Sequence, residues 1–217
     1  MIYLAVKLFI VRHGSTDQLE GNQRQTNDSK LSNQGFNQVR KIGNRLVKTD
    51  IDYFFCSPLK RTEETSEEIS KLIGKKYILD PRLREVDHPK KLYGAKLTDE
   101  IVKKYDREKL NWLDNLDWKF LNEGESLRDV INRTMDFKDE LISKYIDKNV
   151  LIVSHAYAIR CFISGCILGN TYTNEAMLRT VHAVRISKAS LSELEYLAEN
   201  KYFYVNLLND VTHLGEK

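Results

Sequence analysis

The chain has 217 residues, 41% hydrophobic and 30% charged, and its net charge is +3 from 34 basic and 31 acidic residues. This length suits one domain, 1–217, or one domain carrying an inserted cap, and the composition is typical of a soluble globular protein. The two signs of charge are interleaved and no run of 18 apolar residues occurs, so we expect no nucleic-acid partner and no membrane span.

Three cysteines, Cys56, Cys161 and Cys166, are an odd number without the close spacing of a disulfide framework or a zinc site. They predict reduced, buried thiols in a cytoplasmic protein. The apolar N-terminus, Met1–Val11, lacks the basic start of a signal peptide and carries Lys7 in its middle. A buried strand is therefore the better interpretation of this segment.

In the first part of the chain, apolar runs and helical spacing alternate. Phe36, Val39 and Ile42 fall on one helical face, Pro58 suits the first turn of a helix, and Gly74 suits a helix end. The elements predicted here are a strand at Lys7–Val11, a helix at Gln34–Val47, a strand at Asp52–Cys56, a helix from Pro58 to about Ile73, and a short strand at Lys76–Leu79.

Between Arg82 and Glu125 the pattern weakens, and we expect this stretch, 82–125, to form a cap or wall beside a site. Ser126 is a predicted N-cap, and Gly169 is expected to end a later helix. The elements predicted from here on are helices at Thr98–Tyr105, Leu127–Tyr145 and Tyr157–Leu168, and strands at Val150–Val153, Ala183–Ser187, Ser190–Tyr196 and Phe203–Leu208, the last two as an antiparallel edge.

This alternation predicts an α/β fold with a mostly parallel central sheet and helices on both faces. Ligands in such folds bind beyond the carboxyl ends of the strands. Three polar clusters follow predicted strands at such ends: Arg12-His13-Gly14, Ser57–Arg61 and Ser154-His155. We expect these clusters to converge in space and to form the functional site.

The residue types in the three clusters are those that phosphoryl transfer needs. A neutral imidazole, here His13, can attack phosphorus, and arginines, here Arg12 and Arg61, can grip phosphate oxygens with two donors each. His155, protonated in the field of a phosphate, adds a third cation. The start of the helix after it offers backbone N–H groups, at Ala156 and Tyr157, and Gly14 lets the backbone turn and approach the ligand.

Several segments together resemble the histidine phosphatase superfamily, also called phosphoglycerate mutase-like. They are LFIVRHGST at Leu8–Thr16, LSNQG at Leu31–Gly35, SPLKRTEET at Ser57–Thr65, LRE at Leu83–Glu85, GES at Gly124–Ser126, VSHA at Val153–Ala156 and LLNDVTHL at Leu207–Leu214. The matches follow the family order over nearly the whole chain, which makes them far more specific than an isolated RHG tripeptide.

The resemblance implies a three-layer α/β/α sandwich and a phosphohistidine formed on His13. It implies that Arg12, Arg61 and His155 line the phosphate pocket. Glu85 is expected to give a proton to the leaving group and later to take one from water. The resemblance implies no metal and no organic cofactor, and Gly14 and Thr16 of the first motif are expected to contact substrate.

The sequence departs from the family pattern around the substrate. Where many members carry a phosphate-binding Asn, this chain has Leu19, and the candidates to replace it are Gln18, Asn22 and Gln23. In the altered loop, Gly21–Asp28, Arg24 is a candidate substrate contact. Tyr157 stands where a small residue is common, so it narrows the pocket or offers a phenol. The segment after Glu85 also differs, reading VDHPKKLYG at Val86–Gly94.

Other prominent side chains have ordinary structural interpretations. His88 and His182 are expected to be structural, and the aromatics are expected mainly to pack; these are Tyr93, Trp112 and Trp118.

The favoured function is a metal-independent phosphatase acting on a small phosphorylated substrate, either as a monomer or as a homo-oligomer. One alternative is a cofactor-dependent phosphoglycerate mutase, which generally needs a longer closing lid than 82–125 offers. Another is a silent phospholigand-binding protein, which would be expected to lack His13, Arg61 or His155.

Overall fold

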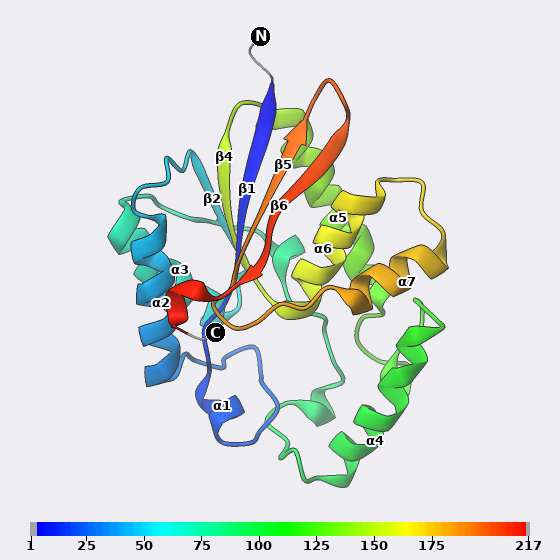
Figure 1. Cartoon of the computed structure of the whole chain (residues 1–217). Coiled ribbons are helices and arrows are strands. Elements are labelled where there is room, and N and C mark those ends of the chain that lie inside the picture. Colours follow the sequence, from blue (N-terminus) through cyan, green and yellow to red (C-terminus); the bar gives the residue numbers. More distant parts are fainter. Residues whose placement is uncertain (1–3, 216–217) are drawn as a thin grey trace.

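A mixed sheet forms the centre of the structure, a computed structural model that describes residues 4–215 (Figure 1). In the described chain its strand order is β3-β2-β4-β1-β5-β6. The strands are β1 (Ala5–Arg12), β2 (Tyr53–Cys56), β3 (Ile78–Leu79), β4 (Asn149–Ser154), β5 (Leu191–Leu197) and β6 (Tyr202–Asp210). The first four strands run parallel, whereas β5 is antiparallel to both β1 and β6.

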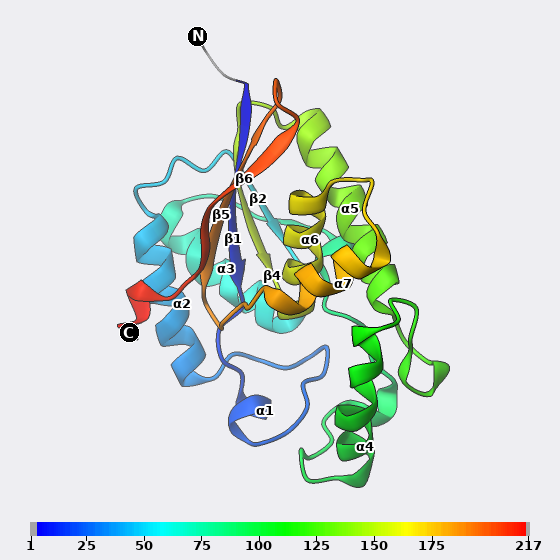
Figure 2. The ribbon, with the colours of Figure 1, turned by 45° about the vertical axis from the view of Figure 1, so that its right-hand side comes forward.

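Helices cover both faces of this sheet, which gives the three-layer α/β/α sandwich expected from the sequence (Figure 2). One face carries α2 (Asn33–Leu46) and α3 (Lys60–Ile73). The other carries α5 (Leu127–Lys144), α6 (Ala156–Leu168) and α7 (Asn174–Ala183). Two short helices, α1 (Asp17–Glu20) and α4 (Glu100–Glu108), lie beyond the end of the sheet (Figure 1).

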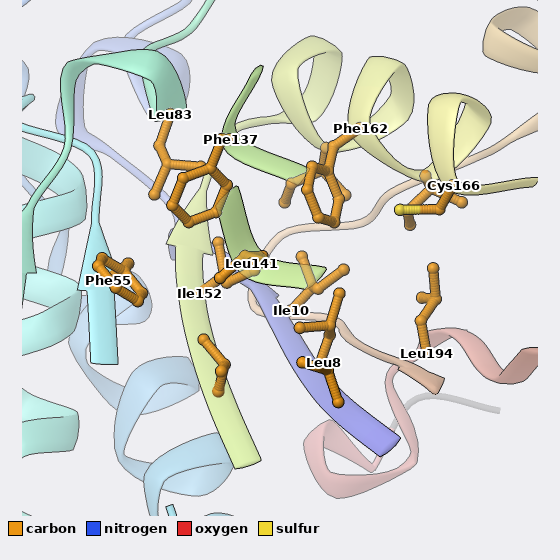
Figure 3. Packing of buried hydrophobic residues seen from close by; sticks show 14 of the residues in the cluster. Leu8, Ile10, Phe55, Leu83, Phe137, Leu141, Ile152, Phe162, Cys166 and Leu194 are labelled. Atoms are coloured by element: carbon orange, nitrogen blue, oxygen red, sulfur yellow. The ribbon is translucent and has the colours of Figure 1, made fainter. Parts of the chain in front are cut away.

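The core follows from the alternation of side chains along the central strands. Leu8 and Ile10 of β1 point to one face, where they meet Phe137 of α5 and Phe162 of α6 (Figure 3). The odd-numbered residues of β1 point to the other face, where Val11 belongs to an apolar cluster packed against α2 and α3. Since β1 and β4 are covered on both sides, their sequences are almost continuously apolar.

Helix boundaries agree with three of the four boundary residues named from the sequence, including Gly169, which directly follows the last residue of α6. Ser126 caps α5 in a full capping box with Asp129, and Gly74 ends α3 at a φ of 70°. The expectation that Pro58 opens α3 is wrong, because the helix begins at Lys60. The Ser57 N–H still bonds the Val153 carbonyl of the sheet, so the chain needs two further residues to turn into the helix.

The strand expected at Ala183–Ser187 is also wrong. Residues up to Ala183 belong to α7, which the Thr173 side chain caps by accepting a hydrogen bond from the Ala176 N–H. Met177 and Val181, four positions apart, are both fully buried, as on the inner face of a helix. In the expected strand itself, Val184 and Ile186 are buried between exposed neighbours, which is the alternation that suggests a strand. The chain after α7 connects to β5 without joining the sheet.

The stretch 82–125 packs beyond the carboxyl ends of the parallel strands (Figure 1). It has a small apolar cluster of its own, which includes Val102, Tyr105 and Phe120. Trp112 is buried and donates from Nε1 to the Trp118 carbonyl at 3.1 Å, so this pair packs as expected. The helix within this stretch, α4, starts two residues later than predicted.

The three cysteines are buried, as expected. Among residues 4–215, no helix is both long enough and apolar enough to cross a bilayer.

Candidate active site

Two histidines meet where neighbouring parallel strands end. Arg12, the last residue of β1, pairs in register with Ser154, the last residue of β4. The next residue of each chain segment is a histidine, so His13 and His155 emerge side by side, with ring centroids 5.1 Å apart. The convergence expected from strand ends therefore results directly from the sheet register.

The His13 imidazole is held in one orientation. Only 1% of the residue is exposed, and Nδ1 lies 2.7 Å from the Gly14 carbonyl oxygen. A carbonyl only accepts hydrogen bonds, so this contact assigns the proton of the neutral ring to Nδ1 and leaves a lone pair on Nε2. Burial holds the pKa of His13 well below its ordinary value, and the positive charges of Arg61 and Arg12 lower it further.

The His155 ring is fully buried and is anchored at one nitrogen. Its Nε2 lies 2.7 Å from the Ser57 Oγ, and its Nδ1 has no partner among the described residues. Burial first, and then the charge of Arg61, lowers its pKa well below the ordinary value. With nothing bound, both rings are therefore uncharged, and an arriving phosphate changes that balance because it favours a protonated imidazole.

Each of the two arginines is fixed through one of its nitrogens. The Arg61 Nη1 donates to the Thr26 carbonyl at 2.8 Å, and the Arg12 Nη1 donates to the Ile186 carbonyl at 2.7 Å. In both side chains Nε is buried without a partner in the described structure. Burial lowers the pKa of Arg61 to about 10 even though Glu85 opposes the shift, so both groups are positioned cations with donors to spare for an oxyanion.

The Glu85 carboxylate is hydrogen-bonded to the backbone shortly after His155. It accepts hydrogen bonds from the backbone N–H of Tyr157 at 3.1 Å and of Ala158 at 3.3 Å, at the start of α6. It therefore acts as the cap of this helix, because the N-cap residue His155 makes no side-chain capping bond. This attachment keeps an acidic group beside the two imidazoles.

A cavity of about 250 Å³ lies beside these groups: Arg12, Arg61 and Glu85 are among its lining residues, whereas His13 and His155 are not. Its wall combines cations, acids and aromatic rings, and the Arg24 guanidinium stacks over the Tyr105 ring at 4.4 Å. The lining residues are Arg12, Leu19, Arg24, Gln25, Thr26, Asn27, Leu59, Arg61, Arg84, Glu85, Val86, Asp87, His88, Tyr93, Leu97, Tyr105, Lys109, Ala156 and Tyr157. The stretch 82–125 supplies nine of them.

Two of the residues expected to contact substrate do not line this cavity. A side chain at Gly14 would place its Cβ 2.7 Å from the Gly35 carbonyl oxygen, so Gly14 is needed for the close approach of α2 rather than for approach to a ligand. Thr16 is buried, and its Oγ1 accepts a hydrogen bond at 2.8 Å from the side chain of Gln25, which does line the cavity.

The amides that accompany Leu19 in the cavity are Gln25 and Asn27, not the three candidates named from the sequence. The loop around them is irregular, and spacing alone gives no sign of which side chains face inward. His88 lines the cavity and also packs on the Tyr105 ring at 5.1 Å between centroids. His182 lies on α7, outside the lining.

The sequence matches a known protein family over most of its length. The profile of the histidine phosphatase superfamily (branch 1) matches residues 8–211. The chain is 30% identical over 215 residues to phosphoserine phosphatase 1 of Hydrogenobacter thermophilus, covering 97% of this chain and 95% of that protein. It is also 30% identical over 212 residues to a protein of Enterobacter sp. named "Probable phosphoglycerate mutase GpmB", covering 96% and 95%.

Solved structures of similar fold include two that cover nearly the whole chain. A mycobacterial glucosyl-3-phosphoglycerate phosphatase, solved with VO3, superposes with a TM-score of 0.77 at 25% identity and covers 94% of this chain and 99% of that one. The Bacillus stearothermophilus protein YhfR superposes with a TM-score of 0.79 at 22% identity, covering 96% and 99%.

Proposed function

The chain belongs to the histidine phosphatase superfamily, and from that premise we propose that it hydrolyses small phosphomonoesters through a phosphohistidine on His13. Membership and the names of the relatives support a phosphatase or a mutase. The observation that carries the proposal is the His13 ring, buried, uncharged and hydrogen-bonded through Nδ1. This leaves Nε2 as the nucleophile without a separate base.

In the first step the Nε2 lone pair of His13 attacks phosphorus, and the bond from phosphorus to the ester oxygen breaks. The Arg12 and Arg61 guanidiniums neutralise the charge on the three non-bridging oxygens. Glu85, in its protonated form, gives its proton to the leaving oxygen, so the alcohol departs neutral. The products of this step are a free alcohol, a Glu85 carboxylate and a phosphorylated His13.

In the second step a water molecule takes the place of the departed alcohol. The Glu85 carboxylate removes a proton from this water as its oxygen attacks phosphorus, and the bond between phosphorus and Nε2 breaks. Inorganic phosphate leaves, and both His13 and Glu85 return to their starting protonation states. Glu85 thus acts as the general acid in the first step and as the general base in the second.

The test combines turnover with detection of the intermediate. Purified protein is assayed with p-nitrophenyl phosphate in the presence of EDTA, and phosphohistidine is trapped by alkaline quench and observed by ³¹P NMR. His13→Ala should abolish turnover and the phosphorus signal while leaving the circular dichroism spectrum unchanged. His182→Ala, a histidine change on α7, is the matched control and should retain both.

Retained turnover in His13→Ala would remove His13 from the proposed role. A wild-type protein that binds phosphate but shows no turnover would instead indicate a silent phospholigand-binding protein. For the natural substrate, relatives named for phosphoserine and for glucosyl-3-phosphoglycerate make phosphorylated hydroxy acids and sugars the first compounds to screen.

A mutase is the second candidate, because some relatives carry that name. A mutase must keep water away from the phosphohistidine until the phosphoryl group returns to substrate. Here 82–125 supplies nine of the residues that line the cavity, but it is shorter than the closing lid that a mutase generally needs, so we favour hydrolysis. Conversion of 3-phosphoglycerate to 2-phosphoglycerate, measured with and without a bisphosphoglycerate primer, distinguishes the two reactions.

A further inference from the structure

A second cavity, of about 530 Å³, adjoins Arg12 and lies outside the chemistry described above. It lies beside the end of β1, between the start of α2, α6 and the segment from α7 to β5, which runs along the same end of the sheet (Figure 1). The residues that line it are Arg12, Ser15, Gln34, Gln38, Arg160, Arg185, Ile186, Ser187, Lys188 and Leu214. We refer to this cavity as the basic cleft.

The basic cleft is lined by four cationic side chains and no acidic one: Arg12, Arg160, Arg185 and Lys188. Within residues 4–215 none of the four forms an ion pair. The Nε atoms of Arg12 and Arg160 are also buried without a hydrogen-bond partner. Donors that are buried without a partner are costly for the folded protein, and an anion in the cleft would relieve that cost.

The acids nearest to the basic cleft are engaged elsewhere. The charge of Glu20 raises the pKa of Lys188, but the Glu20 carboxylate already accepts a hydrogen bond from the Ser32 hydroxyl. The charge of Glu85 raises the pKa of Arg12, but the Glu85 carboxylate is hydrogen-bonded to the backbone at the start of α6 and lines the first cavity instead. Burial and then the charge of Arg12 lower the pKa of Lys188, as expected where positive charge is not neutralised.

Neutral donors complete the basic cleft. The Gln38 Oε1 accepts a hydrogen bond from the Ser15 N–H at 2.9 Å, which fixes the amide and leaves its NH₂ group available. Guanidinium and amide donors arranged around a positive cavity suit the oxygens of a phosphate or a carboxylate.

We propose that the basic cleft binds a second oxyanion, of phosphate or carboxylate type, with Arg12 shared between it and the phosphoryl pocket. The oxyanion has two possible sources: a free anion in solution, or a second anionic group on the substrate itself. Because Arg12 contributes to both sites, a free anion would weaken substrate binding, whereas a group on the substrate would strengthen it.

The first experiment is isothermal titration with inorganic phosphate, which does not depend on any catalytic activity. The wild-type protein should bind two phosphates, and Arg185→Gln/Lys188→Gln should bind one. Lys75→Gln/Lys76→Gln removes the same charge from two exposed lysines outside the basic cleft and should still bind two. This result would show that the basic cleft binds a free oxyanion.

The second experiment tests the substrate as the source, and it rests on the proposed function. The KM of Arg185→Gln/Lys188→Gln is measured for p-nitrophenyl phosphate and for O-phosphoserine, which carries a carboxylate. A rise on the order of tenfold for O-phosphoserine alone would place the carboxylate in the basic cleft, while near-normal turnover of p-nitrophenyl phosphate shows that the variant is folded.

Equal phosphate stoichiometry in wild type and variant, together with unchanged KM values for both esters, overturns the proposal. If the protein hydrolyses neither ester, the proposed function is wrong. The titration still shows whether the basic cleft binds an oxyanion, because it does not depend on catalysis.

Discussion

The hydrogen bond between Ser57 and His155 is the contact that most directly orients the second imidazole of the site. Ser57 is buried just after β2, and its Oγ lies 2.7 Å from the His155 Nε2. The other ring nitrogen, Nδ1, is buried and has no partner among the described residues, and we propose that it bonds the phosphate during the reaction. Ser57 thus acts as a positioning residue, because it fixes which edge of the ring remains free.

Ser57→Ala should lower kcat/KM for p-nitrophenyl phosphate roughly tenfold, which corresponds to the loss of one hydrogen bond worth about 1.4 kcal/mol. Ser164→Ala is the matched control. Ser164 is also buried, on α6, but its Oγ makes no hydrogen bond in the described structure. Equal activities in the two variants would show that the Ser57 contact does not position His155 for catalysis.

Glu85 combines an acid–base role with the capping of α6, and one substitution separates the two. Glu85→Gln keeps a side-chain oxygen to accept from the Tyr157 N–H, so the helix should stay capped. The amide cannot donate a proton to a leaving alcohol. We therefore expect a loss of at least tenfold in kcat for an alkyl phosphate, and a smaller loss for p-nitrophenyl phosphate, whose leaving group needs no proton. A uniform loss across the two esters would argue against proton donation.

At the scale of elements, the sequence predicts the sheet and most helices because their apolar spacing is regular. It fails where tertiary structure decides. The helix α7 ends at Ala183, and in the run that follows Val184 and Ile186 are buried between exposed neighbours, as in a strand, but the run pairs with no strand of the described sheet. Likewise Gln25 and Asn27 line the cavity while neighbouring amides do not, because an irregular loop has no period from which an inward face can be read.

The first motif and α2 touch through glycines, and this contact sets the position of the site. A Cβ at Gly35 would lie 2.1 Å from the Ser15 carbonyl oxygen, which is backbone. A Cβ at Gly43, on the same helix, would lie 2.5 Å from the Leu72 Cδ1, the end of a flexible side chain. Comparing an alanine substitution at Gly35 with one at Gly43 therefore distinguishes a steric clash with the motif from the general effect of replacing a helical glycine.

Gly35→Ala should destabilise the protein by at least 2 to 3 kcal/mol in urea unfolding and should reduce turnover, because α2 must move away from the residues after His13. Gly43→Ala should be close to neutral, since the gain in helix propensity of about 1 kcal/mol offsets the shift of Leu72. Similar stability of the two variants would contradict a tight contact between α2 and the motif.

At the scale of the whole molecule, the uncharged histidines of the site link activity to stability. His13 and His155 are 1% and 0% exposed, and their pKa values lie well below the ordinary one. In the unfolded chain both rings return to a pKa of about 6.5. Below that pH the unfolded chain binds protons that the folded protein does not, so stability falls as pH falls.

Urea unfolding between pH 7.5 and pH 5, in buffers free of phosphate and sulfate, should therefore show a steeper decline for wild type than for His13→Asn/His155→Asn. Each histidine contributes up to about 1.4 kcal/mol per pH unit below its unfolded pKa, and the carboxylates, which titrate in both proteins, cancel in the comparison. Vanadate should reduce the wild-type decline, because an anion between the rings stabilises their protonated forms and raises their folded pKa values. Parallel pH profiles for the two proteins, with no effect of vanadate, would mean that the two rings titrate in the folded protein as they do in the unfolded chain, and the buried, uncharged pair of imidazoles proposed here would then be wrong.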